Sequence, residues 1–213
     1  MSGQIYTEKL EETVMLGELS LDGKIRPIKG VLPVAVEAKK QGFKYLIVPK
    51  ENGAEAAVVE GIEIFAFDHL NQVKDWLENR GSMEPLEVDV KSFFNQNGQS
   101  KVLDFSDVRG QENVKRGLEI AAAGGHNAVM VGPPGSGKTM MARRIPTILP
   151  PLSLEEALET TKIHSVSGIL DGGKALITSR PFRAPHHTVS DVALVGGGSI
   201  PMPGEISMSH NGV

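Results

Sequence analysis

Apolar runs and helical patterns alternate over the first 80 residues. Residues 44–48 and 62–67 are apolar runs bounded by turn residues, and they predict two strands. A hairpin is predicted between Val14 and Ile25, because Asp22-Gly23 favours a tight turn. Helices are predicted at residues 31–41, with Pro33 in the first turn and Gly42 past the end, at 52–59 and at 69–78. Residues 79–103 are polar and without periodicity, which favours a linker.

The second half begins with a helical pattern at residues 111–123. Residues 128–131, Ala-Val-Met-Val, then form an apolar run typical of a buried strand, and 138–145 are good helix formers. Ser153-Leu-Glu-Glu156 matches a capping box and predicts a short helix to about Lys162. Residues 171–173, Asp-Gly-Gly, favour a hairpin between two apolar runs.

Between the predicted strand and helix lies a glycine-rich loop that fits the phosphate-loop pattern G-x-x-x-x-G-K-[ST]. Gly135 and Gly137 permit backbone angles closed to other residues, so that consecutive N–H groups can point into one anion-sized hollow. Lys138 is expected to reach the β- and γ-phosphates of a nucleotide, and the Thr139 hydroxyl to ligate Mg²⁺. The alternative is a surface turn that matches by accident, but the pattern of strand, loop and helix argues against it. The predicted nucleotide-binding residues are Gly132, Pro133, Pro134, Gly135, Ser136, Gly137, Lys138, Thr139 and Met140.

Composition narrows the class of protein only a little. The 213 residues include no cysteine, which excludes disulfides and zinc–thiolate sites and fits a cytoplasmic protein. No apolar run approaches the roughly 20 residues that a membrane span needs, so no membrane partner is expected. Residues 1–103 hold 12 Lys and Arg against 16 Asp and Glu, and residues 104–213 hold 10 of each. Neither half has the basic excess typical of a nucleic-acid surface.

The N-terminal region resembles part of the Lon-protease catalytic domain, in the stretch GELSLDGKIRPIKGVLPVAVEAKKQGFKYLIVPKEN from Gly17 to Asn52. In that family a catalytic lysine lies in the helix after a Gly-Gly pair. Here the pair is Lys29-Gly30, and Val34 stands at about the lysine position. A valine cannot take a proton from a serine hydroxyl. The resemblance therefore implies a partial Lon-type fold (S5 domain 2-like, α+β) without protease activity, over residues 1–78.

The second half resembles the magnesium-chelatase-like subgroup of AAA+ ATPases known as the ComM or YifB family. The resemblance is carried by FSDVRGQENVKRGLEIAAAGGHNAVMVGPPGSGKT at 105–139 and RPFRAPHHTVSDVALVGGGSIPMPGEISMSHNGV at 180–213. It implies an αβα parallel-sheet domain over residues 104–213, with residues 107–111 near the adenine, ATP and Mg²⁺ as cofactors, and assembly as a homo-oligomeric ring.

The family resemblance further implies a motor that acts on DNA, as in branch migration. The rival hypotheses are a chelatase-type motor that remodels a protein, and an interaction module insensitive to nucleotide. In this family the acidic pair of the second strand follows S-H-N-G-V, residues 209–213. We therefore expect the chain to be an internal piece of a longer protein, truncated before that pair, that binds ATP without hydrolysing it.

The sequence allows alternative roles for four side chains near residue 183. Arg180 and Arg183 are candidates to meet phosphates of DNA or of a neighbouring subunit's nucleotide, and a solvated role is an equal alternative. His186 and His187 are adjacent, but neighbours in sequence seldom point at one metal ion, and no carboxylate pattern accompanies them. Loop anchoring or a contact with a polymer is the favoured interpretation for both histidines.

Overall fold

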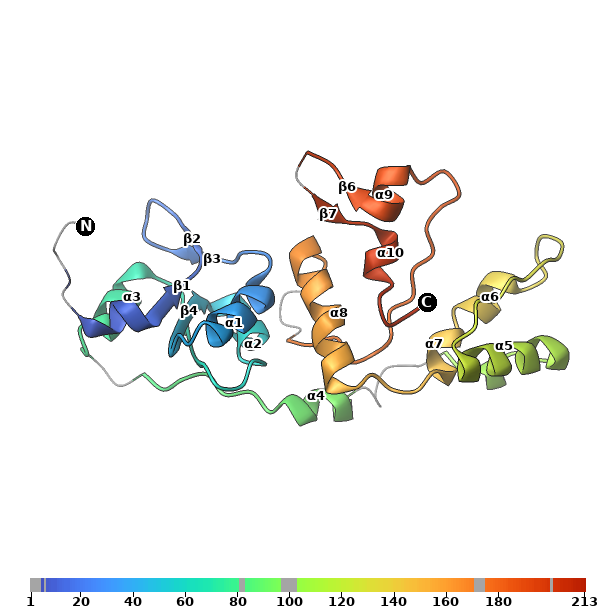
Figure 1. Ribbon diagram of the computed structural model, residues 1–213, viewed down its shortest axis with the longest axis horizontal. Helices are drawn as coiled ribbons and strands as arrows, with labels where there is room; N and C mark the ends of the chain where they lie inside the picture. The colour runs from blue at the N-terminus through green and yellow to red at the C-terminus, as the bar shows by residue number, and fades with distance from the viewer. Residues whose placement is uncertain (1–4, 6, 81–82, 97–102, 171–174, 200) are drawn as a thin grey trace. The chain divides into compact units, whose positions relative to one another are not determined.

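The computed structural model describes residues 5, 7–80, 83–96, 103–170, 175–199 and 201–213 (Figure 1). The chain divides into two compact units. The first comprises Met1–Phe93 together with Thr161–Ile177, and the second comprises Phe94–Thr160 together with Thr178–Val213. None of the described helices is long and apolar enough to cross a membrane. The structure is of the mixed α/β class, as the sequence predicts. Its three-stranded parallel sheet lies within residues 13–67, however, and not among the described residues of 104–213, where the αβα parallel sheet is predicted.

A three-stranded parallel sheet forms the centre of the first unit. Its strands are β1 (Thr13–Met15), β4 (Tyr45–Pro49) and β5 (Glu63–Phe67), in the order β1-β4-β5. Tyr45 is in register with Thr13 on one side and Glu63 on the other. Central strands of parallel sheets are buried on both faces, and Leu46, Ile47 and Val48 of β4 are almost fully buried. The strands predicted at 44–48 and 62–67 are confirmed.

Helices cover this sheet. The helix α3 (Leu70–Leu77) places Val73, Trp76 and Leu77 against Ile47, Phe65 and Phe67, with the Trp76 and Phe65 ring centroids 4.7 Å apart. The helices α1 (Val31–Lys40) and α2 (Gly53–Ala56) also contact the sheet. The remaining elements of the unit are η1 (Glu8–Glu12), the antiparallel pair β2 (Glu18–Leu19) and β3 (Ile25–Arg26), and η2 (Lys50–Asn52). The predicted hairpin at Asp22-Gly23 and the helices at 31–41 and 69–78 are therefore confirmed.

A buried carboxylate holds residues 161–177 in the first unit. The N-terminal turn of α1 begins after Gly30, which has no side chain to cap it. Glu55 accepts the Leu32 N–H at 3.1 Å and an Asn52 amide N–H at 3.2 Å, and the Ser165 hydroxyl donates to the same carboxylate. The Gly30 N–H donates to the Ser165 carbonyl at 3.2 Å. Buried charges require such partners, so this network fixes the segment in place.

The second unit is built mainly of short helices. It contains η4 (Phe105–Asp107), α5 (Glu112–Gly124), α6 (Lys138–Ala142), α7 (Ile145–Ile148), α9 (Asp191–Val195), the antiparallel pair β6 (Gly196–Gly197) and β7 (Met202–Pro203), and α10 (Glu205–Met208). Two further helices, α4 (Val90–Gln96) and α8 (Leu154–Ser167), contain two of the three boundaries between the units, and the third lies between Ile177 and Thr178. The helix α4 therefore lies within the linker predicted at residues 79–103.

The buried strand predicted at residues 128–131 is wrong. Residues 126–133 have no regular secondary structure, and Val129 and Val131 are 89% and 93% exposed. A strand needs a neighbour to complete its ladder of hydrogen bonds, and none of the described residues pairs with this segment. Met130 alone packs inward, against the cluster of Val108, Leu118 and Met141.

The capping box at Ser153 is confirmed, whereas the length of its helix is not. The Ser153 N–H donates to Glu156 Oε2 at 2.8 Å, and the Glu156 N–H donates to Ser153 Oγ at 3.1 Å. The helix α8 then continues to Ser167, five residues beyond the predicted end at Lys162. The hairpin predicted at 171–173 lies outside the described residues.

Candidate nucleotide-binding site

The phosphate loop has the backbone geometry that its glycines predict. Gly135 and Gly137 have φ angles of +77° and +85°, in the left-handed region that side chains disfavour. Gly137 is also the N-cap of α6, so the loop leads directly into that helix. The first turn of a helix leaves its N–H groups without intrahelical acceptors. Those of Lys138, Thr139 and Met140 are therefore available to an anion.

Lys138 folds back over the loop that precedes it. Its ammonium donates to the carbonyl oxygens of Gly132 and Pro133, both at 2.8 Å, and to Ser136 Oγ at 3.1 Å. Thr139, next in the chain, is exposed. The donor set of the loop, an ammonium with adjacent N–H groups and a hydroxyl, therefore fits a phosphate chain with a bound Mg²⁺ ion.

A pocket of about 650 Å³ lies beside the loop. Lys138 and Ser136 contribute to its lining together with Gln111, at the start of α5, and apolar side chains such as Val114 and Ile120. Ligand pockets are roughly 300–1,000 Å³, mostly apolar, with a few polar groups that orient the ligand. The volume and lining suit a ligand with one charged end and one apolar end. Gln111 was placed near the adenine by resemblance, and it shares this pocket with Lys138.

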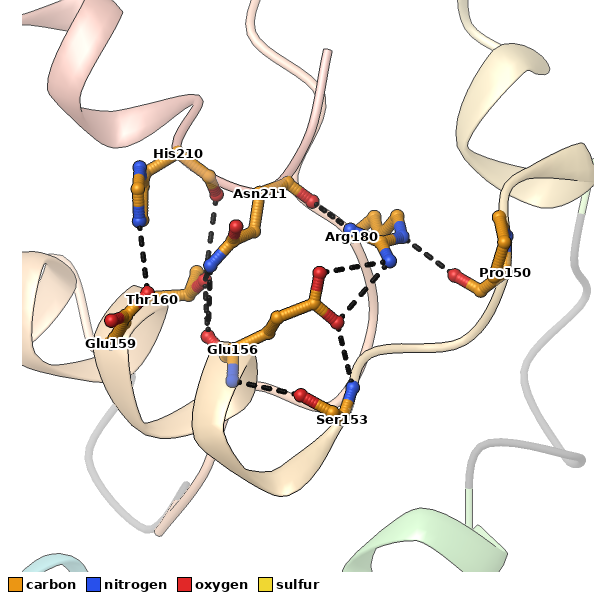
Figure 2. Close-up of polar contacts among 8 residues, drawn as sticks. All are labelled: Pro150, Ser153, Glu156, Glu159, Thr160, Arg180, His210 and Asn211. Atoms are coloured by element: carbon orange, nitrogen blue, oxygen red, sulfur yellow. Dashed lines mark hydrogen bonds and ion pairs between the residues drawn. The ribbon is translucent and has the colours of Figure 1, made fainter. Parts of the chain in front are cut away.

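Arg180 is tied to the protein rather than presented to a polymer (Figure 2). Its guanidinium donates to the Pro150 carbonyl at 2.6 Å, to the Asn211 carbonyl at 2.8 Å and to both carboxylate oxygens of Glu156 at 3.3 Å. The Ser153 N–H, which Glu156 accepts at the start of α8, lowers the pKa of that carboxyl, and Arg180 lowers it further. The network therefore joins the start of α8 to the 211–213 end of the chain.

Arg183 is bound in the same manner to a different carboxylate. Its Nε and Nη2 donate to the two oxygens of Glu205 at 2.5 and 2.6 Å. Hydrogen bonds from Arg183 lower the pKa of Glu205, and the same bonds raise the pKa of Arg183. Fork-to-fork pairs of this kind fix orientation as well as charge.

His186 and His187 lie on an exposed loop with their ring centroids 4.1 Å apart. The Nδ1 of His186 is 2.8 Å from the Thr188 hydroxyl, which is a local contact within the loop. Among the described residues no group of three histidine or acidic side chains is placed to hold a metal ion. Neither histidine lines the pocket beside the phosphate loop.

Comparison with known proteins identifies the family. Residues 104–213 match the family model described as magnesium chelatase, subunit ChlI, and residues 1–52 match the model described as subunit ChlI of Mg-chelatase. The chain belongs to this magnesium-chelatase family.

Individual relatives extend the match to the whole chain. The chain is 47% identical over 213 residues to the uncharacterized protein YifB of Escherichia coli, covering 100% of this chain and 40% of the relative. It is 40% identical over 215 residues to competence protein ComM of Haemophilus influenzae, covering 100% and 41%. Lon protease 2 of Bacillus subtilis is 41% identical over 73 residues, which is 33% of this chain and 13% of the protease. The chain thus spans about 40% of the length of YifB and ComM.

Proposed function

We propose that the chain binds ATP together with Mg²⁺ through residues 132–139. The observation that carries the proposal is the phosphate loop itself: two glycines with positive φ lead into α6, and Lys138 lies at the wall of a pocket of nucleotide size. Lys138 would hold the terminal phosphates, the N–H groups of α6 would hold the phosphate chain, and Thr139 would ligate Mg²⁺. The ion would neutralise phosphate charge.

The contacts of Lys138 support this assignment. Its three acceptors, two carbonyls and one hydroxyl, are neutral. A phosphate oxygen carries negative charge, and hydrogen bonds between charged partners are roughly twice as strong as neutral ones. The ammonium would therefore exchange the loop carbonyls for phosphate with a net gain, while the loop stays intact around it.

Substitution of Lys138 tests the proposal. We expect Lys138→Ala to weaken MgATP binding by about 10- to 100-fold, the equivalent of about 1.5–3 kcal/mol for a hydrogen bond to a charged group. Isothermal titration calorimetry on both proteins measures the difference. Lys74→Ala, at an exposed position on α3, is the matched control and should bind ATP as the unsubstituted chain does. Equal ATP affinity of the Lys138→Ala variant and the parent chain would refute the assignment.

We further propose that this site powers a motor that acts on DNA in a ring of identical subunits. Support comes from the similarity to competence protein ComM, since competence concerns the uptake of DNA. Residues 104–213 have no net charge, so DNA contact would depend on the arrangement of subunits rather than on an overall basic surface. We expect ATP to promote DNA binding, measured by fluorescence anisotropy, and assembly of subunits, measured by light scattering.

Two observations favour functions other than a DNA motor. The family description names magnesium chelatase, which favours a motor that remodels a protein partner. The exposure of Val129 and Val131 beside the loop favours an interaction module that ignores nucleotide. An ATPase rate that a protein partner raises and DNA does not would support the first rival. An unchanged melting temperature with MgATP would support the second.

A further inference from the structure

One buried arginine joins the phosphate-loop helix to the chain segment before α5. Arg144 follows α6 and is only 8% exposed. Its Nε donates to the Asp104 carbonyl at 2.7 Å, its Nη1 to the Met140 carbonyl at 3.0 Å, and its Nη2 to Asp107 Oδ2 at 3.2 Å. Each nitrogen of the guanidinium therefore has an acceptor, and these come from both segments.

The segment held by Arg144 is itself tightly ordered. Asp104 caps η4 by accepting the Ser106 N–H at 2.7 Å, and Asp107 returns to accept the Asp104 N–H at 3.1 Å. These N–H groups are the main cause of the lowered pKa of each carboxyl, and Arg144 adds to both shifts. Asp107 is therefore an anion at neutral pH, so its bond to the guanidinium is charge-assisted.

We call Arg144 and its partners Asp104, Asp107 and Met140 the Arg144 clamp. Its member Asp107 lies four residues before Gln111, which lines the pocket. After Asp107 come the buried Val108 and then Gly110 and Gln111, with φ angles of +70° and +62°. A positive φ is uncommon for a residue other than glycine. The backbone at Gln111 follows the buried Val108, and its carbonyl accepts the Lys115 N–H of α5 at 2.9 Å. Gln111 lines the same pocket as Lys138. Arg144 thus connects the segment that leads to Gln111 with the helix that begins at Lys138.

We propose that Arg144 is a positioning residue that aligns the base-binding wall at Gln111 with the phosphate loop, an inference that rests on the proposed ATP binding. Arg144 does not line the pocket, and its contact with the phosphate-loop helix is the Met140 carbonyl, whereas the groups available to an anion are the N–H donors of that helix. It acts through Asp104 and Asp107, so its loss misplaces the wall for the nucleoside and leaves the phosphate contacts of Lys138 and α6 in place. The consequence is a selective effect on ligands that carry a base.

Binding of two ligands separates this role from a general structural one. Affinities for MgATP and for magnesium tripolyphosphate, which has the phosphate chain without a nucleoside, are measured by calorimetry on the full chain. We expect Arg144→Gln to weaken ATP binding by about tenfold, equivalent to about 1.4 kcal/mol, and to weaken tripolyphosphate binding by less than about twofold. Arg144→Lys keeps the positive charge but not the planar guanidinium, so its ATP affinity should lie between those of the parent chain and of Arg144→Gln.

Two further variants complete the design. Arg143→Gln changes the adjacent, exposed arginine, whose side chain makes no hydrogen bond among the described residues, and both affinities should stay unchanged. Because removal of a buried arginine can unfold a protein, Asp107→Asn leaves Arg144 in place and removes only the negative charge of its exposed partner. We expect this variant to bind ATP about threefold more weakly, equivalent to about 0.7 kcal/mol, and to bind tripolyphosphate with unchanged affinity.

Two patterns of affinity would overturn the positioning role. One is an equal loss of both ligands in folded Arg144→Gln and Asp107→Asn proteins, and the other is no loss of either ligand. Failure of the proposed function has a different signature. In that case the parent chain and its Lys138→Ala variant bind ATP equally, whatever residue stands at position 144.

Discussion

At the scale of single residues, the pair of Arg183 and Glu205 makes stability depend on pH in a definite direction. Arg183 lowers the pKa of Glu205 below the ordinary value of 4.5. A carboxyl with a lowered pKa in the folded state contributes stability above its unfolded pKa and loses it as the pH falls through the folded pKa. The contribution should therefore be complete at pH 6 and decline below about 4.5.

Glu205→Gln tests this direction. At pH 6 the variant should unfold at a lower urea concentration than the parent chain, because Arg183 loses a charged partner with two hydrogen bonds. The gap in unfolding free energy should narrow as the pH is lowered from 5 toward 3. Glu84→Gln, at an exposed position, should show no gap at either pH. A gap that is constant with pH would contradict the role of charge.

Arg180 and Arg183 show that local sequence patterns do not predict contacts between distant residues. The sequence left Arg180 and Arg183 between phosphate contact and solvation, and neither alternative describes them. Their carboxylate partners lie 24 and 22 residues away, and no local pattern links such distant positions. By contrast the glycines of the phosphate loop were predicted correctly as loop positions, because their backbone requirement is a property of the residue itself.

At the scale of elements, the start of α8 depends on one hydroxyl. Ser153 satisfies the Glu156 N–H at the first turn, where the backbone has no intrahelical acceptor. We expect Ser153→Ala to lower the free energy of unfolding by about 1 kcal/mol and the melting temperature by about 2–4 °C. Thermal unfolding followed by circular dichroism measures the shift. Ser199→Ala, at an exposed position without a hydrogen bond among the described residues, should melt as the parent does, and an equal shift in both would refute the cap.

Elements divide into those set by local signals and those set by a neighbour. The capping box at Ser153 and the glycine after α1 are local, and both were predicted from sequence. Residues 128–131 have an apolar pattern suited to a strand, but a strand exists only when another strand pairs with it. No described residue does so, and Val129 and Val131 stay exposed. The apolar pattern of residues 128–131 therefore does not predict their burial, which depends on a partner strand.

At the scale of the whole molecule, packing joins segments that sequence order separates. Residues 161–177 belong to the unit of the N-terminal sheet, and Ser165 contacts both Gly30 and Glu55 there. No local pattern indicated this contact, because the helix predicted from Ser153 ends at about Lys162 and Ser165 lies beyond that end. The predicted boundaries at residues 78 and 103 stay predictions. The family, in contrast, was identified correctly from two motif-bearing stretches, because such stretches carry specific residues rather than a general pattern.

The final prediction concerns ATP turnover by the 213-residue chain. Hydrolysis needs a carboxylate or an equivalent group that orients the attacking water beside the terminal phosphate. Among the described residues, no aspartate or glutamate lines the pocket that holds Lys138. Glu205 is bound by Arg183, and Asp191 lies in the first turn of α9. We therefore expect MgATP to bind without phosphate release above the rate of the Lys138→Ala variant. A coupled phosphate assay on both proteins, purified in parallel, measures this, and faster release by the parent chain would show that one of its own carboxylates reaches the bound nucleotide.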